Sequence, residues 1–362
     1  MTTIKKLSEV TINRIAAGEV IERPASVLKE LIENSIDAGA NNIEITIEGA
    51  GKNLIKISDD GSGMGRDDVE LAIQRHTTSK LNENDIMKID NFGFRGEALP
   101  SIAAVSRLSI GSSTDGKEAC QISLEGGKNI KSQKIIHNKG TTVTARDLFF
   151  ATPARLKFLR SDRIELNACK DIIKKISISH HSVGFKFISD NKILFDLPSN
   201  QALESRIQDI LGEDFTNNSS KISYNQNNIN ITGITSLPTY NKGNAEDQFL
   251  YVNNRPVKDK ILIVAVRVAY QDFIEKGRHP LICLFLNINP REVDVNVHPA
   301  KNEVRFHDPN LIRQAIMNAI ENALYESHNR VSDSLSKDFK NVLYKNTTPT
   351  NQSRYRGNFS DN

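Results

Sequence analysis

The sequence lacks several features that would assign its class at once. Its three cysteines, Cys120, Cys169 and Cys283, are odd in number and far apart, so they predict neither a disulfide framework nor a zinc site. No apolar run approaches the roughly 20 residues that a membrane-spanning helix needs. Basic residues near the N-terminus are followed by no apolar segment, so we expect no secretory signal. These absences predict a cytoplasmic protein without a membrane partner.

An excess of charge is also missing. Lys and Arg number 47 against 44 Asp and Glu, a formal charge of +3 that neither demands nor excludes a polyanionic partner. Any nucleic-acid site must therefore come from local basic clusters. The 362 residues predict two folded units and a tail, since a domain averages roughly 150 residues.

Residues 1–150 show the pattern of an α+β unit. Pro24 at a first helical position and Gly39 beyond the last predict a helix over residues 24–38. Alternating isoleucines from Ile43 and an apolar run from Leu54 predict two strands that meet around residues 49–51. We expect further helices at 67–75 and within 95–105, and strands at 107–112, 118–124 and 141–146.

Residues 151–330 predict a second α+β unit. A helical pattern runs from Thr152 to about residue 178, and strands are expected near 184–195, 229–236, 248–253 and 281–297. Apolar periodicity fades beyond about Glu326, so residues 331–362 are predicted to be a polar linker or tail.

Polar residues on the first predicted helix are the first candidates for chemistry. Glu30, Glu33, Asn34 and Asp37 follow a helical spacing, which by itself is typical of a solvated face. A glycine-rich loop that begins at Asp59 comes directly after a strand, where a carboxylate can accept a hydrogen bond from an exocyclic amine. A second glycine loop, residues 91–99, precedes a helix whose free amides suit an anion.

Two better known nucleotide motifs are absent. Gly51 and Lys52 are followed by Asn53 where a P-loop has Ser or Thr. Arg66 stands where a dinucleotide fingerprint starting at Gly61 needs its last glycine.

Taken together, these elements resemble the GHKL ATPases, which include DNA gyrase B subunits, Hsp90 chaperones, histidine kinases and MutL. Residues 16–26, 29–40, 93–99 and 294–301 are similar to signatures of the MutL branch, which acts in DNA mismatch repair. The other branches lack the last block. The resemblance implies a GHKL α/β sandwich over residues 1–150 and an α+β domain similar to domain 2 of ribosomal protein S5 over residues 151–330.

The same resemblance implies roles for individual residues. Glu30 is expected to be the general base and Asn34 the Mg²⁺ ligand, while Lys301 reaches the γ-phosphate of ATP from the second domain. The expected contacts to adenine are Asp59, Gly63 and Thr141. The expected phosphate and lid contacts are Thr78, Ser79, Lys80, Gly93, Phe94, Arg95, Gly96, Glu97, Ala98 and Leu99.

Some of these positions keep a structural alternative. Arg95 and Glu97 pair equally well with each other or with the backbone, and His76 and His298 are expected to be structural. Asp60 replaces the Asn that many members of the family carry, so we expect it to shift the electrostatics of the adenine pocket.

Basic clusters are the candidates for DNA contact. Arg155 and Lys157 lie beside Phe158 at the start of a predicted helix. The resemblance also matches Lys260 to a family position that lines a DNA groove. A solvated charged face remains the alternative for both clusters. The resemblance implies salt-sensitive, largely sequence-independent DNA binding.

The resemblance also implies partners. These are a second copy of the chain joined through residues 1–20 when ATP binds, a MutS-type mismatch recognition protein, and downstream endonuclease or helicase factors. The protein is then nucleoid-associated in a bacterium or nuclear in a eukaryote.

Three functions compete at this point. The first is a slow Mg²⁺-dependent ATPase, without an endonuclease site in this chain, that acts as a repair switch. The second is a nucleotide-gated DNA- or protein-binding module without significant turnover. The third, a type II topoisomerase ATPase domain, is opposed by the block at residues 294–301.

Overall fold

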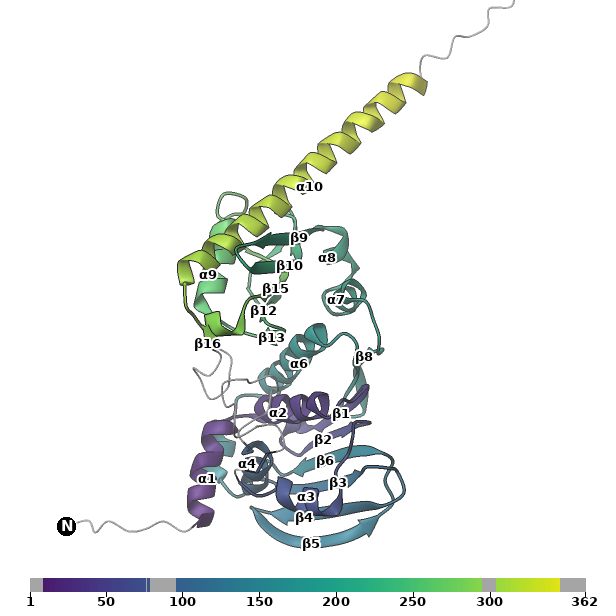
Figure 1. Cartoon of the computed structure of the whole chain (residues 1–362), viewed down its shortest axis with the longest axis vertical. Helices are drawn as coiled ribbons and strands as arrows, with labels where there is room; N and C mark the ends of the chain where they lie inside the picture. Colours follow the sequence, from purple (N-terminus) through teal and green to yellow (C-terminus); the bar gives the residue numbers. More distant parts are fainter. Residues whose placement is uncertain (1–8, 76, 79–95, 295–303, 346–362) are drawn as a thin grey trace, which may run out of the picture.

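Two β-sheets with a layer of helices between them make up the body of the molecule (Figure 1). The structure, a computed structural model, describes residues 9–75, 77–78, 96–294 and 304–345. A long helix, α10 (Pro309–Lys345), packs on the second sheet and then projects away from the body. Within the described ranges, no helix combines the length and the apolar character that crossing a membrane requires.

The first sheet has eight strands in the order β5-β4-β3-β6-β2-β1-β7-β8. Their bounds are β1 Asn42–Glu48, β2 Leu54–Asp59, β3 Arg107–Ser113, β4 Ala119–Glu125, β5 Lys128–Ile135, β6 Gly140–Arg146, β7 Gly184–Ser189 and β8 Lys192–Leu197. Within this sheet, β1 and β7 pair in parallel and all the other neighbouring strands pair antiparallel. Ile43, Ile45 and Ile47 of β1 are buried on one face, because successive side chains of a strand alternate.

The predicted hairpin between the first two strands is confirmed. β1 and β2 pair antiparallel, and a 3-10 turn over Gly49–Gly51 joins them. A Cβ atom at Gly51 would lie 2.7 Å from the Cβ of Pro24, and its φ of +84° also favours glycine. The turn therefore packs closely on the start of the helix that follows the N-terminal segment.

Helices cover the buried face of this sheet. They are α1 (Glu9–Val20), α2 (Pro24–Asp37), α3 (Arg66–Ala72), α4 (Ala98–Val105) and α6 (Asp162–Ser179). Helix α2 begins at Pro24 as predicted, and Gly39 beyond its end adopts a φ of +72°. Short helices α5 (Pro153–Phe158), α7 (Leu203–Leu211) and α8 (Glu213–Asn217) complete the connections to the second sheet.

The second sheet has five strands in the order β13-β12-β15-β10-β9. Their bounds are β9 Ser219–Gln226, β10 Ile229–Ser236, β12 Gln248–Val252, β13 Arg255–Pro256 and β15 Ile282–Asn287. One face packs on α9 (Lys260–Ala269) and α10. On the other face, Tyr251 and Phe285 stack at 4.5 Å, and the Tyr251 hydroxyl donates to the Lys175 carbonyl of α6 at 2.9 Å.

The division that we placed at residue 150 does not separate the two sheets. β6 and β7 run in the same direction, so the chain has to cross the sheet between them, and α6 makes that crossing. One buried cluster then extends from Ile45 of β1 through Ile173 of α6 to Phe249 of β12. Helix α6 thus serves as a shared layer for both sheets.

The linker predicted over residues 331–362 is helical in its first part, which was not expected. Helix α10 continues to Lys345, whereas Leu324 is the last buried residue among the side chains that the structure describes, which end at Ser327. The packed part, from Ile312 onward, nucleates the helix, and each further residue then adds a hydrogen bond at lower cost. Polar composition alone did not reveal this continuation.

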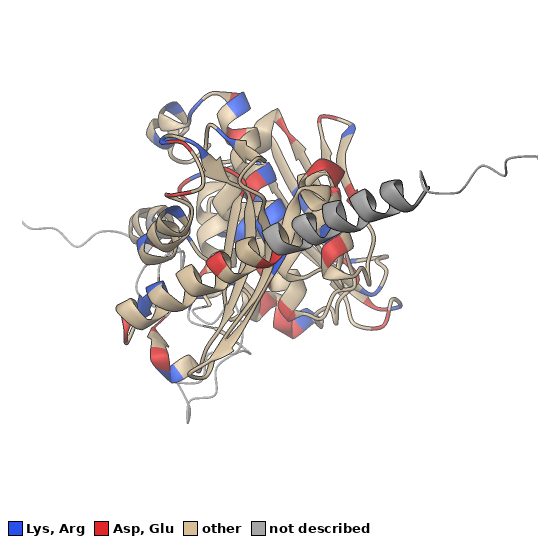
Figure 2. Ribbon diagram, turned by 90° about the horizontal axis from the view of Figure 1, so that it is seen from above, with Lys and Arg blue, Asp and Glu red and all other residues tan. Residues whose placement is uncertain are grey.

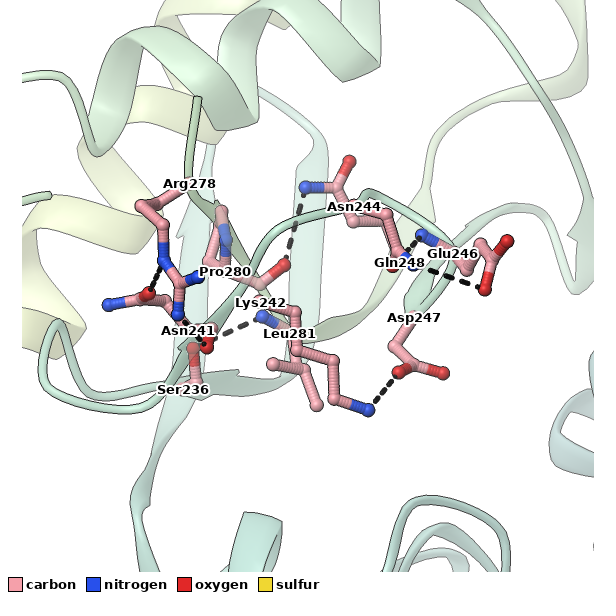
Figure 3. Close-up of polar contacts among 10 residues, drawn as sticks. All are labelled: Ser236, Asn241, Lys242, Asn244, Glu246, Asp247, Gln248, Arg278, Pro280 and Leu281. Atoms are coloured by element: carbon pink, nitrogen blue, oxygen red, sulfur yellow. Dashed lines mark hydrogen bonds and ion pairs between the residues drawn. The ribbon is translucent and has the colours of Figure 1, made fainter. Parts of the chain in front are cut away.

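Polar contacts fasten a small ribbon beside the second sheet (Figure 3). Strands β11 (Asn241–Lys242) and β14 (His279–Pro280) pair antiparallel. Arg278 donates through Nη2 to the Asn241 carbonyl at 3.0 Å, and Lys242 lies 2.5 Å from the Asp247 carboxylate. A further ribbon of β16 (Val293–Asp294) and β17 (Arg305–Phe306) follows the 3-10 turn Pro290–Glu292.

A fully buried arginine joins α6, α7 and the edge of the first sheet. Burial lowers the pKa of Arg206 to about 10, so the guanidinium stays charged at neutral pH. Its charge is stabilised by hydrogen bonds to uncharged oxygen acceptors. The acceptors are the carbonyls of Ser177, His181, Val183 and Pro198 and the side-chain oxygen of Gln201.

We predict that Arg206→Ala lowers the free energy of unfolding by about 3 kcal/mol or more, because several buried oxygens lose their donor together. Arg206→Lys should recover only part of this, since an ammonium cannot reproduce the planar fork. Denaturant unfolding measures both, with the exposed Arg163→Ala as control. An Arg206→Ala variant as stable as the control would contradict this role.

Candidate functional site

Asp59 occupies the end of β2, where two donors hold its carboxylate. The Ser35 hydroxyl of α2 donates to Oδ2 at 2.8 Å, and the Gly61 amide donates to Oδ1 at 3.0 Å. Ser35 is itself buried. The contact ties α2 directly to the strand end at which we expected the recognition of an exocyclic amine.

The charge state of Asp59 follows from this environment. Burial is the largest influence and raises the pKa of Asp59 above its ordinary value. Hydrogen bonds from Ser35, Gly61 and Thr141 oppose the rise, because they stabilise the ionised form. The Ser35 hydroxyl is therefore one of the groups that keep this carboxylate an acceptor.

Asp60 has a structural task in addition to the electrostatic one expected. Burial is the largest single influence and opposes ionisation, but the hydrogen bonds from Asn42 and Asn41 together outweigh it and lower the pKa of Asp60. The donors are the Asn41 amide at 2.7 Å, the Asn42 amide at 2.9 Å and the Asn42 side chain at 2.9 Å. Asp60 thus anchors the start of β1, and its charge is the smallest influence on the pKa of Asp59.

A second hydrogen-bond network fixes the glycine loop after Asp59. The Thr141 hydroxyl lies 2.8 Å from the Ser112 hydroxyl, and Ser112 accepts from the Met64 amide at 2.8 Å. A Cβ at Gly63 would approach the Ser113 carbonyl oxygen to 1.9 Å, and its φ is +68°. Thr141 therefore acts on the loop through Ser112, while its backbone supports Asp59.

The polar stripe predicted on α2 is not a solvated face. Glu30 and Asn34 are half-buried one helical turn apart. Glu33 departs from the stripe: it is 4% exposed and forms an ion pair with Lys29 at 3.5 Å. We thus correct its placement, because the side chain turns toward Lys29 on the flank of the helix.

The start of α4 lies beside the segment at Thr77. A Cβ at Gly96 would be 2.4 Å from the Thr77 carbonyl oxygen, so the two backbones touch. Glu97 precedes the first helical residue, Ala98, and the free amides of this end suit an anion. Thr78 is exposed and Leu99 is half-buried. The other expected contacts, Ser79, Lys80, Gly93, Phe94, Arg95 and Lys301, lie outside the described residues, as do His76 and His298.

The donor set on α2 fits Mg²⁺ better than a transition metal. Asn34 offers a neutral amide oxygen, and Mg²⁺ commonly binds through one or two protein oxygens, waters and substrate phosphates. Within the residues that the structure describes, no group of three or more His, Cys, Asp or Glu side chains is placed to hold a metal ion.

The expected DNA-binding residues lie in different surroundings. Lys157 and Lys260 are exposed. Arg155 is half-buried, and a Cβ at Gly18 would overlap its guanidinium at 1.5 Å, so Arg155 packs against α1. Basic and acidic residues are otherwise interspersed over the molecule (Figure 2).

A separate hollow of about 410 Å³ lies between α1, α4 and the turn from β4 to β5. Ile12, Ala103, Leu124 and Gly127 are among the residues that line it. None of its lining residues is an expected nucleotide contact.

Family models match both halves of the chain. Residues 21–145 match the "Histidine kinase-, DNA gyrase B-, and HSP90-like ATPase" family, which covers α2, the Asp59 loop and Thr141. Residues 207–325 match "DNA mismatch repair protein, C-terminal domain".

Curated relatives agree with both matches. The chain is 54% identical over 349 residues to "DNA mismatch repair protein MutL" of Rickettsia bellii (strain RML369-C), which covers 94% of this chain and 57% of that protein. The MutL protein of Rickettsia conorii (strain ATCC VR-613 / Malish 7) is 52% identical over 97% of this chain and 59% of its own. The chain belongs to the MutL family of DNA mismatch repair proteins. It spans less than three-fifths of these two relatives.

Solved structures support the MutL fold. The N-terminal domain of a DNA repair protein superposes with a TM-score of 0.77 at 25% identity, over 88% of this chain and 99% of that one. The Aquifex aeolicus MutL ATPase domain complexed with ADP gives a TM-score of 0.59 at 25% identity, over 82% and 98%. A Francisella tularensis topoisomerase IV ATP-binding domain, 17% identical with a TM-score of 0.52, shows the shared fold alone.

Sequence reasoning missed Ser35 and Ser112. Ser35 had a visible signal, because it continues the buried spacing of Val27 and Leu31 at four-residue intervals. A serine there predicts a buried polar partner. Ser112 gave no such signal, since its partner Thr141 lies 29 residues away on a neighbouring strand.

We predict that Ser35→Ala weakens ATP binding roughly fivefold at neutral pH, about the value of one hydrogen bond. As the expected adenine contact, Asp59 accepts a hydrogen bond in its ionised form, so the affinity should fall as the pH drops through the pKa of Asp59. Loss of the Ser35 donor raises that pKa and moves the fall to higher pH. Nucleotide titrations between pH 5 and 8 measure the shift.

The matched control for this test is Ser106→Ala. Ser106 is also buried and donates to the carbonyl four residues earlier, at 2.7 Å, as Ser35 does to Leu31. The Ser106 hydroxyl donates to the Ile102 carbonyl and not to Asp59, so its loss should leave the pH profile in place. Identical profiles for both variants would refute the positioning role of Ser35.

Proposed function

We propose that the chain is a slow, Mg²⁺-dependent ATPase whose nucleotide state switches a DNA mismatch repair complex. The contact that supports this most directly is the Ser35–Asp59 hydrogen bond of 2.8 Å. It holds the carboxylate that would read adenine against the helix that carries Glu30 and Asn34. The match of residues 21–145 to the ATPase family supports the ATPase part of this proposal.

Each residue then has a task in hydrolysis. Asp59 accepts a hydrogen bond from the amino group of adenine, and the loop around Gly63 lies along the base. Glu30 acts as the general base. It orients the water that attacks the γ-phosphate and takes up a proton from it. Asn34 would hold Mg²⁺ through its side-chain amide oxygen, and the bound cation would supply positive charge to the phosphates.

The phosphate end of the site completes the switch. Residues 93–99 form the lid whose amides close on the triphosphate, together with Thr78, Ser79 and Lys80. Lys301 reaches the γ-phosphate from the second domain. This contact ties the relative orientation of the two domains to the nucleotide that is bound. ATP binding orders the lid and the N-terminal segment, residues 1–20, and so drives homodimerisation. Hydrolysis resets the switch, because the ligand then no longer favours the closed state.

The biological partners follow from the family. The dimer couples a MutS-type mismatch recognition protein to downstream endonuclease or helicase factors, and it binds DNA through Lys157, Lys260 and Arg155. The competing proposal is a nucleotide-gated matchmaker without significant turnover, and the hydrolysis assay below separates the two.

We predict that Glu30→Ala lowers kcat about 100-fold or more while ATP still binds, because a general base contributes at least that factor. Steady-state phosphate release and nucleotide titration measure the two quantities. Glu44→Ala is the control, since Glu44 lies on β1 and pairs with Lys186 at 3.3 Å. Unchanged turnover in Glu30→Ala would favour the matchmaker.

We also predict that a non-hydrolysable ATP analogue with Mg²⁺ converts the monomer to a dimer, whereas ADP does not. Analytical ultracentrifugation of the same sample with and without nucleotide measures this. Asn34→Ala should lose the Mg²⁺-dependent part of the shift, because the amide oxygen is the expected ligand. A strictly unchanged monomer would disprove the switch.

A further inference from the structure

Helix α5 presents an aromatic ring to solvent. Phe158, its last residue, is 85% exposed, and α5 has no buried residue. The exposed rings of Phe273 and Tyr325, by contrast, contact each other edge to face at 6.1 Å. Within the described part of the chain, no ring contact involves Phe158. An aromatic side chain with this exposure lowers its free energy when another planar group covers it.

Three basic residues lie close to this ring in the sequence. Lys157, Arg160 and Arg163 are all exposed, and no ion pair among the described residues engages their side chains. The two nearby carboxylates are already occupied. Asp162 lies 2.5 Å from Lys52, and Glu165 binds Arg23 at 2.9 Å. The segment therefore presents an excess of three cations.

The backbone at this ring is held in place. The amide of Arg160 donates to Glu165 Oε1 at 3.1 Å, and Glu165 is 1% exposed. Arg155, one turn before Phe158, packs on Gly18 of α1. Phe158 thus lies on a short helix that is anchored on both sides, which lowers the entropy lost when a ligand covers the ring.

We propose that Phe158 is a stacking platform for an unpaired nucleotide base of single-stranded DNA, with Lys157, Arg160 and Arg163 at the adjacent phosphates. Aromatic stacking combined with a cationic groove is the usual way to hold a single strand without reading its sequence. Duplex DNA hides its base faces, so it gains the phosphate contacts but not the stacking. The inference rests on the DNA binding proposed above and adds the strand form and the contact residue.

A protein partner fits this surface less well. The cores of protein interfaces carry few charges and are depleted of lysine, although they are enriched in aromatic residues and arginine. Here the exposed apolar residues Leu156, Phe158 and Ile164 are interleaved with cations. The charge pattern complements a polyanion and would remain unpaired against an apolar surface.

The test compares a single-stranded thymidine oligonucleotide with one of equal length in which central bases are replaced by abasic residues. The wild-type chain should bind the base-bearing strand at least about fivefold more tightly. Phe158→Ala should lose that difference, while its affinity for duplex DNA stays the same. Phe158→Trp should keep it, because a larger ring still stacks. Fluorescence anisotropy at fixed salt measures all three.

Control variants separate this inference from the proposed function. Phe273→Ala removes another exposed ring and should change nothing, whereas Lys157→Glu should weaken binding to base-bearing, abasic and duplex DNA alike. If Phe158→Ala binds every DNA like wild type, or weakens all forms equally, the stacking role is wrong although DNA binding stands. If the wild-type chain binds no DNA, both the stacking role of Phe158 and the proposed DNA binding are wrong. The hydrolysis assay tests the ATPase proposal separately. If Phe158→Ala changes only self-association, the surface is a protein interface and the proposal is overturned.

Discussion

The half-buried carboxylate of Asp59 is the constraint on which the nucleotide end of the molecule depends. A carboxylate largely withdrawn from water is costly unless donors satisfy it, and here the Ser35 hydroxyl and the Gly61 amide do so. Ser35 belongs to α2 and Gly61 to the loop after β2, so meeting this requirement fixes helix, strand and loop together. The positions of Glu30 and Asn34 on α2 follow from the same contact.

Close backbone approach is the second condition of the site. Three glycines lie so close to a backbone carbonyl that no side chain would fit there. The pairs are Gly63 with the Ser113 carbonyl, Gly140 with the Asp59 carbonyl, and Gly96 with the Thr77 carbonyl. The loop after Asp59 is further bound through Met64 to Ser112 and Thr141. These contacts leave the loop little freedom, which suits a pocket that must be formed before its ligand arrives.

The layer formed by α6 connects this site to the rest of the chain. The helix contributes to the buried cluster that both sheets share, and Arg206 ties its end to β7 and α7. The nucleotide-dependent change that we propose would therefore meet a continuous packed layer between the sheets. Packed layers of this kind have few alternative arrangements, which is the property a two-state switch uses.

The sequence by itself determined the elements whose signals are local. Pro24 and Gly39 gave the bounds of α2, the isoleucines of β1 gave a half-buried strand, and the blocks around Glu30 and Asn34 gave the family. It missed β5 and β9, because both are edge strands with polar faces and lack a strong alternation. Only the tertiary structure decided that β7 joins the first sheet, that Asp60 anchors β1 and that Ser112 meets Thr141. These contacts join residues far apart in the chain, so their energies depend on packing that no local pattern records.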